Sequence, residues 1–149
     1  SMAETAKAFF TASEKERLNM AIKHAELETS GDIRLHLESV SKGDVMDRAA
    51  QVFAQLDMHK TELRNGVLVY LAISNRKFAV LGDKGINAVV GPDFWDEIKS
   101  NMILRFRDGL FTDGLCEAIE AIGMSLKKHF PRQRNDVNEL PDDLSFGKN

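Results

Sequence analysis

The chain has 149 residues, of which 43% are hydrophobic and 29% charged, which is the composition of one globular domain with its own core. Its net charge of −3, with acidic and basic residues mixed along the chain, argues against nucleic acid as the main partner. The single cysteine, Cys116, excludes an internal disulfide and a cysteine-based zinc site.

No apolar run approaches the ~20 residues that a membrane helix needs, and no basic-then-apolar leader begins the chain. We therefore expect a soluble, cytoplasmic monomer without a membrane span, whose protein partner the sequence leaves open. Ser1 ahead of Met2 is typical of a remnant of tag cleavage, so a leader removed upstream remains an alternative.

The first predicted elements are a helix followed by a strand. Ser13 and Glu16 have the spacing of a capping box, and apolar residues then recur at helical intervals, which predicts a helix over 13–28. Between Ile33 and Leu37 apolar and polar residues alternate, which is typical of a half-buried strand.

The next predicted elements are a helix and two strands. Asp44 is a suitable N-cap for a helix that ends near Met58. The β-branched and aliphatic run over 66–73 indicates a strand covered on both faces, and the run over 78–81 predicts an antiparallel partner joined by a short hairpin.

Two more helices are predicted, one opened by Gly91 and Pro92 and one opened by Thr112 and ended by Pro131. From residue 132 onward the chain is polar, and we expect a surface tail that adds little to the core. The predicted organisation is a tag remnant and N-terminal extension over 1–12, an α/β domain over 13–130, and a polar C-terminal tail over 131–149.

The order of elements defines the fold class. The strand at 33–37, the helix after it and the strand at 66–73 form a parallel crossover unit, and the third strand returns antiparallel. Helices should then cover both faces of the sheet. The sequence therefore predicts an α/β protein, a three-layer α/β/α sandwich with a small mixed central sheet.

The common catalytic motifs for nucleophilic elbows, phosphate loops and zinc helices are absent from the sequence. Four histidines are scattered over different predicted elements without metal-ligand spacing. Arg34, His36 and Glu38 share one strand face, which either lines a polar pocket or, as is more common, packs under a helix.

Three loops should converge at one edge of the predicted sheet, because the antiparallel third strand ends where the two parallel strands begin. They carry Asp32, Asn65 and Asp83, and the turn containing Asp108 would close over them. Carboxylate and amide oxygens on glycine-bent loops suit Ca²⁺ or Mg²⁺. The alternative is that aspartate and glycine only form turns there.

These segments resemble the TPM domain, a family that includes thylakoid-lumen proteins tied to photosystem II repair and a nematode acetylcholine-receptor modulator. The resemblance covers about residues 13 to 130 and suggests the short, soluble bacterial form. It is carried by Thr29-Ser30-Gly31-Asp32-Ile33, Asn65-Gly66-Val67-Leu68-Val69, Lys77-Phe78-Ala79-Val80-Leu81-Gly82-Asp83-Lys84-Gly85-Ile86, Phe106-Arg107-Asp108-Gly109-Leu110-Phe111 and Gly114-Leu115.

The resemblance implies an α/β/α sandwich, divalent-cation binding in some members and a phosphatase-like, proposed acid-phosphatase activity in the plant branch. This chain departs from the family pattern at four positions. Arg64 stands where relatives often have an acidic residue, Leu110 and Phe111 replace Asp-Tyr, and Asp83 replaces a common tyrosine.

The preferred hypothesis is a TPM-type domain that binds a divalent cation, Ca²⁺ or Mg²⁺, through Asp83, Asp32, Asp108 and Asn65 and serves in protein interaction. Two alternatives remain at this point. One is a weak metal-dependent acid phosphatase, for which the sequence offers no identifiable nucleophile or base. The other is a metal-free structural interaction module.

Overall fold

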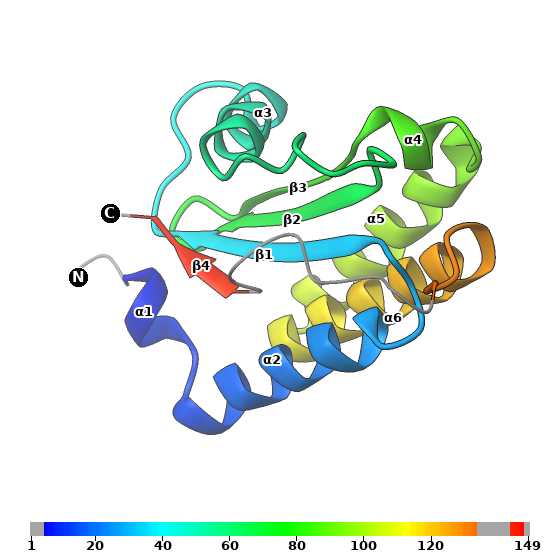
Figure 1. The fold of residues 1–149 in the computed structure, drawn as a ribbon. Coiled ribbons are helices and arrows are strands. Elements are labelled where there is room, and N and C mark those ends of the chain that lie inside the picture. The colour runs from blue at the N-terminus through cyan, green and yellow to red at the C-terminus, as the bar shows by residue number, and fades with distance from the viewer. Residues whose placement is uncertain (1–4, 134–143, 148–149) are drawn as a thin grey trace.

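The fold is a three-layer sandwich built on one mixed sheet (Figure 1). The computed structural model describes residues 5–133 and 144–147. The sheet has the strand order β3-β2-β1-β4, with α3 on one face and α2, α5 and α6 on the other. The predicted α/β/α sandwich with a small mixed central sheet is confirmed.

The parallel pair at the centre of the sheet consists of β1 (Asp32–Glu38) and β2 (Gly66–Ala72). Asp32 pairs with Gly66, and the register continues to Glu38 opposite Ala72. All seven residues of β1 are buried, although their alternation predicted a strand with one solvated face. Polar residues on the second face lie under α3 instead of facing solvent.

The helix α3 (Val45–Gln55) connects β1 with β2, and the predicted cap at its start is confirmed. The Asp44 side chain accepts a hydrogen bond from the backbone N–H of Asp47 at 3.0 Å. Ala49, Val52 and Phe53 pack on Leu68, Tyr70 and Ala72 of β2 in a small apolar cluster. The predicted crossover unit is therefore present.

The strand β3 (Lys77–Gly82) returns antiparallel to β2, as predicted. It ends directly before a short helix that the sequence analysis missed, α4 (Lys84–Asn87), for which Asp83 is the N-cap. The glycine-containing loop after β3 is thus partly helical.

Three helices cover the other face: α2 (Ala12–Glu26), α5 (Pro92–Arg107) and α6 (Phe111–His129). Their apolar side chains and the inward residues of β1 and β2 form the larger core. α2 and α6 approach closely, since a Cβ added at Gly123 would lie 2.6 Å from the Cβ of Ala25. Trp95 of α5 is half-buried, and its indole N–H donates to the Asn87 side chain at 3.0 Å.

The capping box of α2 lies two residues earlier than predicted. Thr11 is the N-cap, and its hydroxyl accepts from the Glu14 backbone at 3.0 Å while Glu14 accepts from the Thr11 backbone at 2.9 Å. The predicted box of Ser13 and Glu16 is therefore wrong.

Two segments outside the predicted domain take part in the fold. α1 (Ala6–Phe9) precedes α2, and Ala6 and Phe10 are buried in the larger core. β4 (Leu144–Phe146) pairs parallel with β1, and the Gly147 N–H donates to the Leu37 carbonyl at 2.9 Å. The tail was expected only to lie on the surface and to add little to the core, but 144–146 add an edge strand to the sheet, while 134–143 lie outside the described residues.

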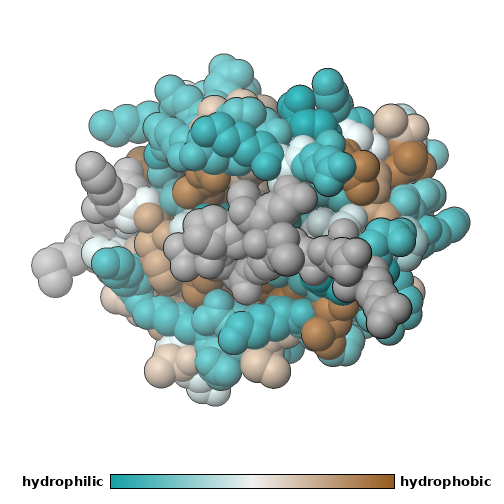
Figure 2. Space-filling view, in the orientation of Figure 1, coloured by the Kyte–Doolittle hydropathy of each residue, from teal (hydrophilic) through white to brown (hydrophobic). Residues whose placement is uncertain are grey.

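In the view of Figure 2, hydrophilic side chains dominate and the apolar ones form small separate groups. None of the described helices is long and apolar enough to cross a membrane.

Candidate functional site

The loops at the start of β1 and β2 and the loop at the end of β3 meet at one edge of the sheet. The Asp83 N–H donates to the Gly66 carbonyl at 2.9 Å, and the Asn65 side-chain amide donates to the Ser30 hydroxyl at 3.2 Å. Asp32, the first residue of β1, is opposite Gly66 in the register. This edge is the candidate site, and we call it the loop edge.

Asp83 is the central carboxylate of the loop edge and is only 7% exposed. Arg64 donates to it through two nitrogens, Nε to Oδ2 at 2.7 Å and Nη2 to Oδ1 at 2.9 Å. The Lys84 N–H donates to Oδ1 as well, at 2.8 Å. A buried carboxylate needs such counter-charge and donors, because leaving water disfavours its ionised form.

The backbone of the two loops fixes this pairing. Arg64 has φ of 51°, in the left-handed region that is costly for a residue with a Cβ. The Gly85 N–H donates to the Arg64 carbonyl at 2.8 Å, and a Cβ at Gly85 would overlap the carbonyl oxygen of Leu63. Only glycine permits this approach, which places α4 against the segment that carries Arg64.

The structure places Asp108 away from the loop edge. The start of α5 lies beside Gly82, because a Cβ there would be 2.5 Å from the Trp95 ring. The end of α5 lies beside the other end of β3, where the rings of Phe106 and Phe78 are 5.4 Å apart. The turn containing Asp108 is therefore at the opposite end of the sheet, and the expectation that it closes over the three loops is wrong.

The residues at the loop edge whose side-chain oxygens could bind a cation are thus Asp32, Asn65 and Asp83. Asp32 is 3% exposed and Asn65 is 1% exposed. Their oxygens suit a hard cation in chemical type. Within residues 5–133 and 144–147, however, no three His, Cys, Asp or Glu side chains are grouped as metal ligands, and the guanidinium of Arg64 already binds both oxygens of Asp83.

A second polar cluster lies under α3 and contains the strand residues His36 and Glu38. Glu38 accepts from Tyr70 at 2.5 Å and from two nitrogens of Arg48, one of them Nε at 3.1 Å. His36 contacts Glu38 at 3.4 Å through Nε2 and the hydroxyl of Ser145 in β4 at 2.8 Å through Nδ1. We call these residues the Glu38 network.

The surroundings shift the protonation of this network. Burial disfavours the charged form of Glu38, but the hydrogen bonds from Arg48 and Tyr70 outweigh it and keep its pKa below the usual value. Burial lowers the pKa of His36, although Glu38 acts in the opposite direction. Burial and the hydrogen bond to Glu38 raise the pKa of Tyr70 to about 12.

A cavity of about 530 Å³ adjoins the network, lined among others by His36, Glu38, Arg48 and Phe146. Both oxygens of Glu38 are nevertheless occupied by donors from the protein itself. All three residues of the strand face, Arg34, His36 and Glu38, are buried, and Glu38 is held by the charged partner Arg48 from α3. The sequence analysis missed Tyr70 in this role, because it lies in a run that indicates only a buried strand.

The chain is similar to known proteins in sequence and in structure. The sequence profile of the TPM domain matches residues 4–125. This chain belongs to the TPM domain family. The suspected resemblance is therefore confirmed, and the match includes all three loops of the loop edge. No protein among those with curated functions matches the chain.

Solved structures share the TPM fold. The BA42 protein of the psychrophilic bacterium Bizionia argentinensis, determined by NMR, is 46% identical, with a TM-score of 0.88 over 98% of this chain and 100% of that chain. The N-terminal domain of a P. gingivalis protein is 20% identical, with a TM-score of 0.66 over 84% of this chain and 83% of that chain.

The N-terminal domain of the cg2496 protein of Corynebacterium glutamicum is 12% identical, with a TM-score of 0.63 over 91% of this chain and 80% of that chain. At these low identities, the last two structures demonstrate the shared fold alone. In this TPM domain, Arg64 and Asp83 form an ion pair. Sequence reasoning noted Arg64 as a departure from the family but not as the partner of Asp83.

Proposed function

We propose that this TPM domain is a binding module whose loop edge takes up a divalent cation in exchange for the guanidinium of Arg64, and that cation uptake prepares this edge for a protein partner. The observation that carries the proposal is the bidentate pair of Arg64 with the buried carboxylate of Asp83. A positive charge is needed at this carboxylate, and Arg64 supplies it within the chain.

Exchange is feasible because the two partners differ in exposure. The Arg64 side chain is 36% exposed, whereas that of Asp83 is 7% exposed. Arg64 can therefore rotate into solvent without opening the core, and Asp83 stays in place as the N-cap of α4. A cation at Asp83 would draw further oxygens from Asn65 and Asp32 and from water.

The same arrangement predicts weak binding. Two carboxylates and one amide are fewer charged ligands than a tight calcium site provides, and the cation must also displace an existing ion pair. We expect a Kd in the millimolar range for Ca²⁺ and for Mg²⁺, on the order of the weakest protein calcium sites.

The test is a titration of the full chain with CaCl₂ and MgCl₂ followed by amide NMR. The wild type should show shifts at 30–32, 64–66 and 82–85, and Asp83→Asn should lose them. Arg64→Gln should bind about fivefold more tightly, because it removes a competitor whose pair is worth up to about 1 kcal/mol.

A matched control is Arg105→Gln, which removes another bidentate arginine, held by Glu117 at 2.8 and 3.0 Å. This variant should bind cations as the wild type does. The proposal is wrong if Arg64→Gln binds no more tightly than Arg105→Gln, or if the shifts lie away from the loop edge. A chain that shows no saturable shifts in either variant would be the metal-free interaction module instead.

A further inference from the structure

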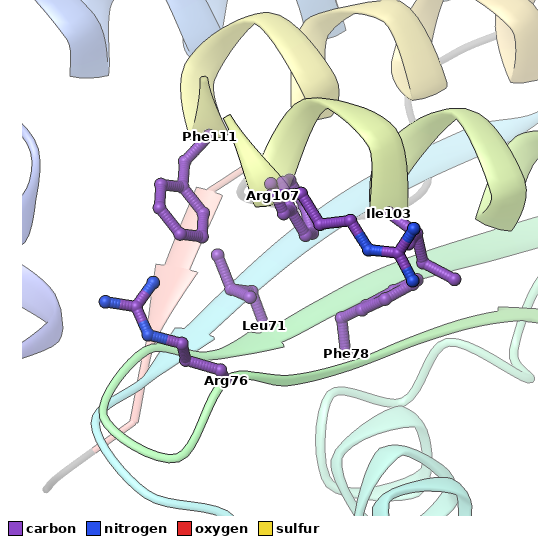
Figure 3. A pocket seen from close by; sticks show the side chains of 7 residues that line it. Leu71, Arg76, Phe78, Ile103, Arg107 and Phe111 are labelled. Atoms are coloured by element: carbon purple, nitrogen blue, oxygen red, sulfur yellow. The ribbon is translucent and has the colours of Figure 1, made fainter. Parts of the chain in front are cut away.

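An apolar pocket lies at the end of the sheet opposite the loop edge, between the β2–β3 hairpin and the turn that joins α5 to α6 (Figure 3). Its volume is about 230 Å³. Leu71 and the rings of Phe78, Phe106 and Phe111 form its walls. We call it the hairpin pocket.

The walls of the hairpin pocket are held by contacts between the rings. Phe78 and Phe106 meet edge to face with centroids 5.4 Å apart, and Phe106 stacks on Phe111 at 5.0 Å. These aromatic rings come from β3, α5 and α6, so three elements of the core fix the pocket. A pocket with rigid walls binds without the cost of ordering them first.

The mouth of the pocket carries two arginines, Arg76 and Arg107, both exposed. Figure 3 shows their guanidinium groups on either side of Leu71. The guanidinium of Arg76 lies 5.4 Å from the centroid of the Phe111 ring. In the part of the chain that the structure describes, neither arginine belongs to an ion pair, unlike Arg64, Arg48 and Arg105.

The volume of the hairpin pocket and the charge at its mouth indicate which kind of ligand it can bind. A pocket for a whole cofactor or drug-sized molecule usually measures about 300–1,000 Å³, so this one has room for a single large side chain. Two arginines without carboxylate partners attract acidic groups, on a chain whose net charge is −3. Ile103 also lines the pocket and is exposed, so it adds apolar contact area at the mouth.

We propose that the hairpin pocket docks an acidic peptide segment of a partner protein. One large apolar side chain of that segment fills the pocket, and carboxylates on either side of it pair with Arg76 and Arg107. This arrangement has the form of a protein interface anchor, an apolar side chain in a pocket with charged groups at the rim. It goes beyond cation binding at the loop edge and does not depend on it.

The test uses a defined probe, the blocked peptide acetyl-Asp-Glu-Phe-Glu-Asp-amide, added to the full chain and followed by amide NMR. The shifts should lie at 76–78 and 103–111, at the opposite end of the sheet from those of the cation titration. A peptide with alanine in place of phenylalanine should bind at least about tenfold more weakly, since the buried ring supplies most of the affinity.

Charge is tested by Arg76→Gln and Arg107→Gln, each of which should weaken binding about threefold at low salt, in the range of a surface ion pair. Lys23→Gln removes an exposed charge from α2 and should have no such effect. Ile103→Trp narrows the pocket while keeping both arginines, and it should abolish binding. Added salt should weaken binding of the wild type.

Several results would overturn the proposal. One is the absence of shifts at millimolar peptide. Another is an equal effect of Lys23→Gln and Arg107→Gln, which would indicate attraction of the peptide by general charge only. Binding of 3-phenylpropionate as tightly as the peptide would assign the pocket to small aromatic carboxylates and not to a protein partner.

Discussion

The two faces of the sheet are both buried, but one is covered by apolar side chains and the other contains polar and charged groups. Ile33, Leu35 and Leu37 of β1 face α2 and α6 in a large apolar core. On the other face, His36 and Glu38 are equally buried but lie among charged and polar partners beneath α3. The first face is stabilised by loss of apolar surface from water, and the second depends on hydrogen-bond and charged partners for its buried polar groups.

Alternation of apolar and polar residues in a strand therefore does not by itself indicate a solvated face. His36 and Glu38 are buried with partners from three elements, which are Arg48 of α3, Tyr70 of β2 and Ser145 of β4. Such a face tolerates little change, since removing one member leaves the others buried and unsatisfied. Five predictions test this difference between the faces, from the largest expected effect to the smallest.

The largest effect is expected for Glu38→Ala. It leaves Tyr70 and Arg48 without their acceptor, and we expect a loss of about 3–5 kcal/mol in the free energy of unfolding, measured in urea. Glu117→Ala breaks the exposed pair with Arg105 and should cost less than about 1 kcal/mol.

A triple variant, Glu38→Leu with Arg48→Met and Tyr70→Phe, sharpens the same point. Replacing a whole buried ionic network with apolar residues is often nearly neutral. The triple variant should therefore be more stable than Glu38→Ala alone. If the triple variant and Glu38→Ala are equally unstable, the shapes of the side chains, and not the pairing of charges, determine the stability of this face.

The next effect concerns β4, which borders the polar face. A chain that ends at Gln133 loses the pairing of β4 with β1 and the half-buried side chains of Leu144 and Phe146. We expect a loss of about 2 kcal/mol, equivalent to a few net hydrogen bonds, with unfolding still cooperative. An unchanged urea midpoint would show that β4 contributes nothing to stability.

A smaller effect is expected for Tyr70→Phe. It removes one hydrogen bond to a charged acceptor while Arg48 still pairs with Glu38, which should cost about 1.5 kcal/mol. The substitution should also change how the free energy of unfolding depends on pH. Because the pKa of Tyr70 is about 12 in the folded state, wild-type stability should fall as pH rises from 10 toward 12, and the variant should lack this part of the loss.

The smallest effect concerns His36. Its pKa is lowered in the folded state by burial, so the unfolded chain binds more protons and stability should fall as pH decreases below 6.5 toward the folded pKa. His36→Gln should remove this part of the loss. Glu38 acts in a separate range below about pH 4.5, where its lowered pKa makes stability fall again. If the free energy of unfolding depends on pH in the same way for wild type and His36→Gln between pH 5 and 7, His36 does not cause this loss of stability.

The sequence was sufficient for the elements with strong patterns. The apolar run of β2 and the Asp44 cap of α3 are local signals, and both are present in the structure. The cap of α2 was not decidable locally, because Thr11 with Glu14 and Ser13 with Glu16 have the same spacing. The choice is made in the tertiary structure, where Thr112 donates to Glu14 at 2.8 Å.

The candidate site was predictable only where topology alone determines it. The antiparallel return of β3 brings Asp83 to Asn65, which follows from the strand order. The place of Asp108 depends on the direction in which α5 runs along the sheet, and no local pattern specifies that direction. The pairing of Arg64 with Asp83 depends on a left-handed backbone at a residue other than glycine, which sequence seldom reveals.

The parallel pairing of β4 with β1 also has a consequence for biosynthesis. Among the described strands, β4 leaves the ribosome last, more than one hundred residues after β1, so the outer edge of β1 is without this partner over that interval. An open strand edge is a template for association with other chains. Chaperone contacts and intermolecular pairing in the cell should therefore concentrate at the β1 edge of nascent chains and disappear once Phe146 has emerged.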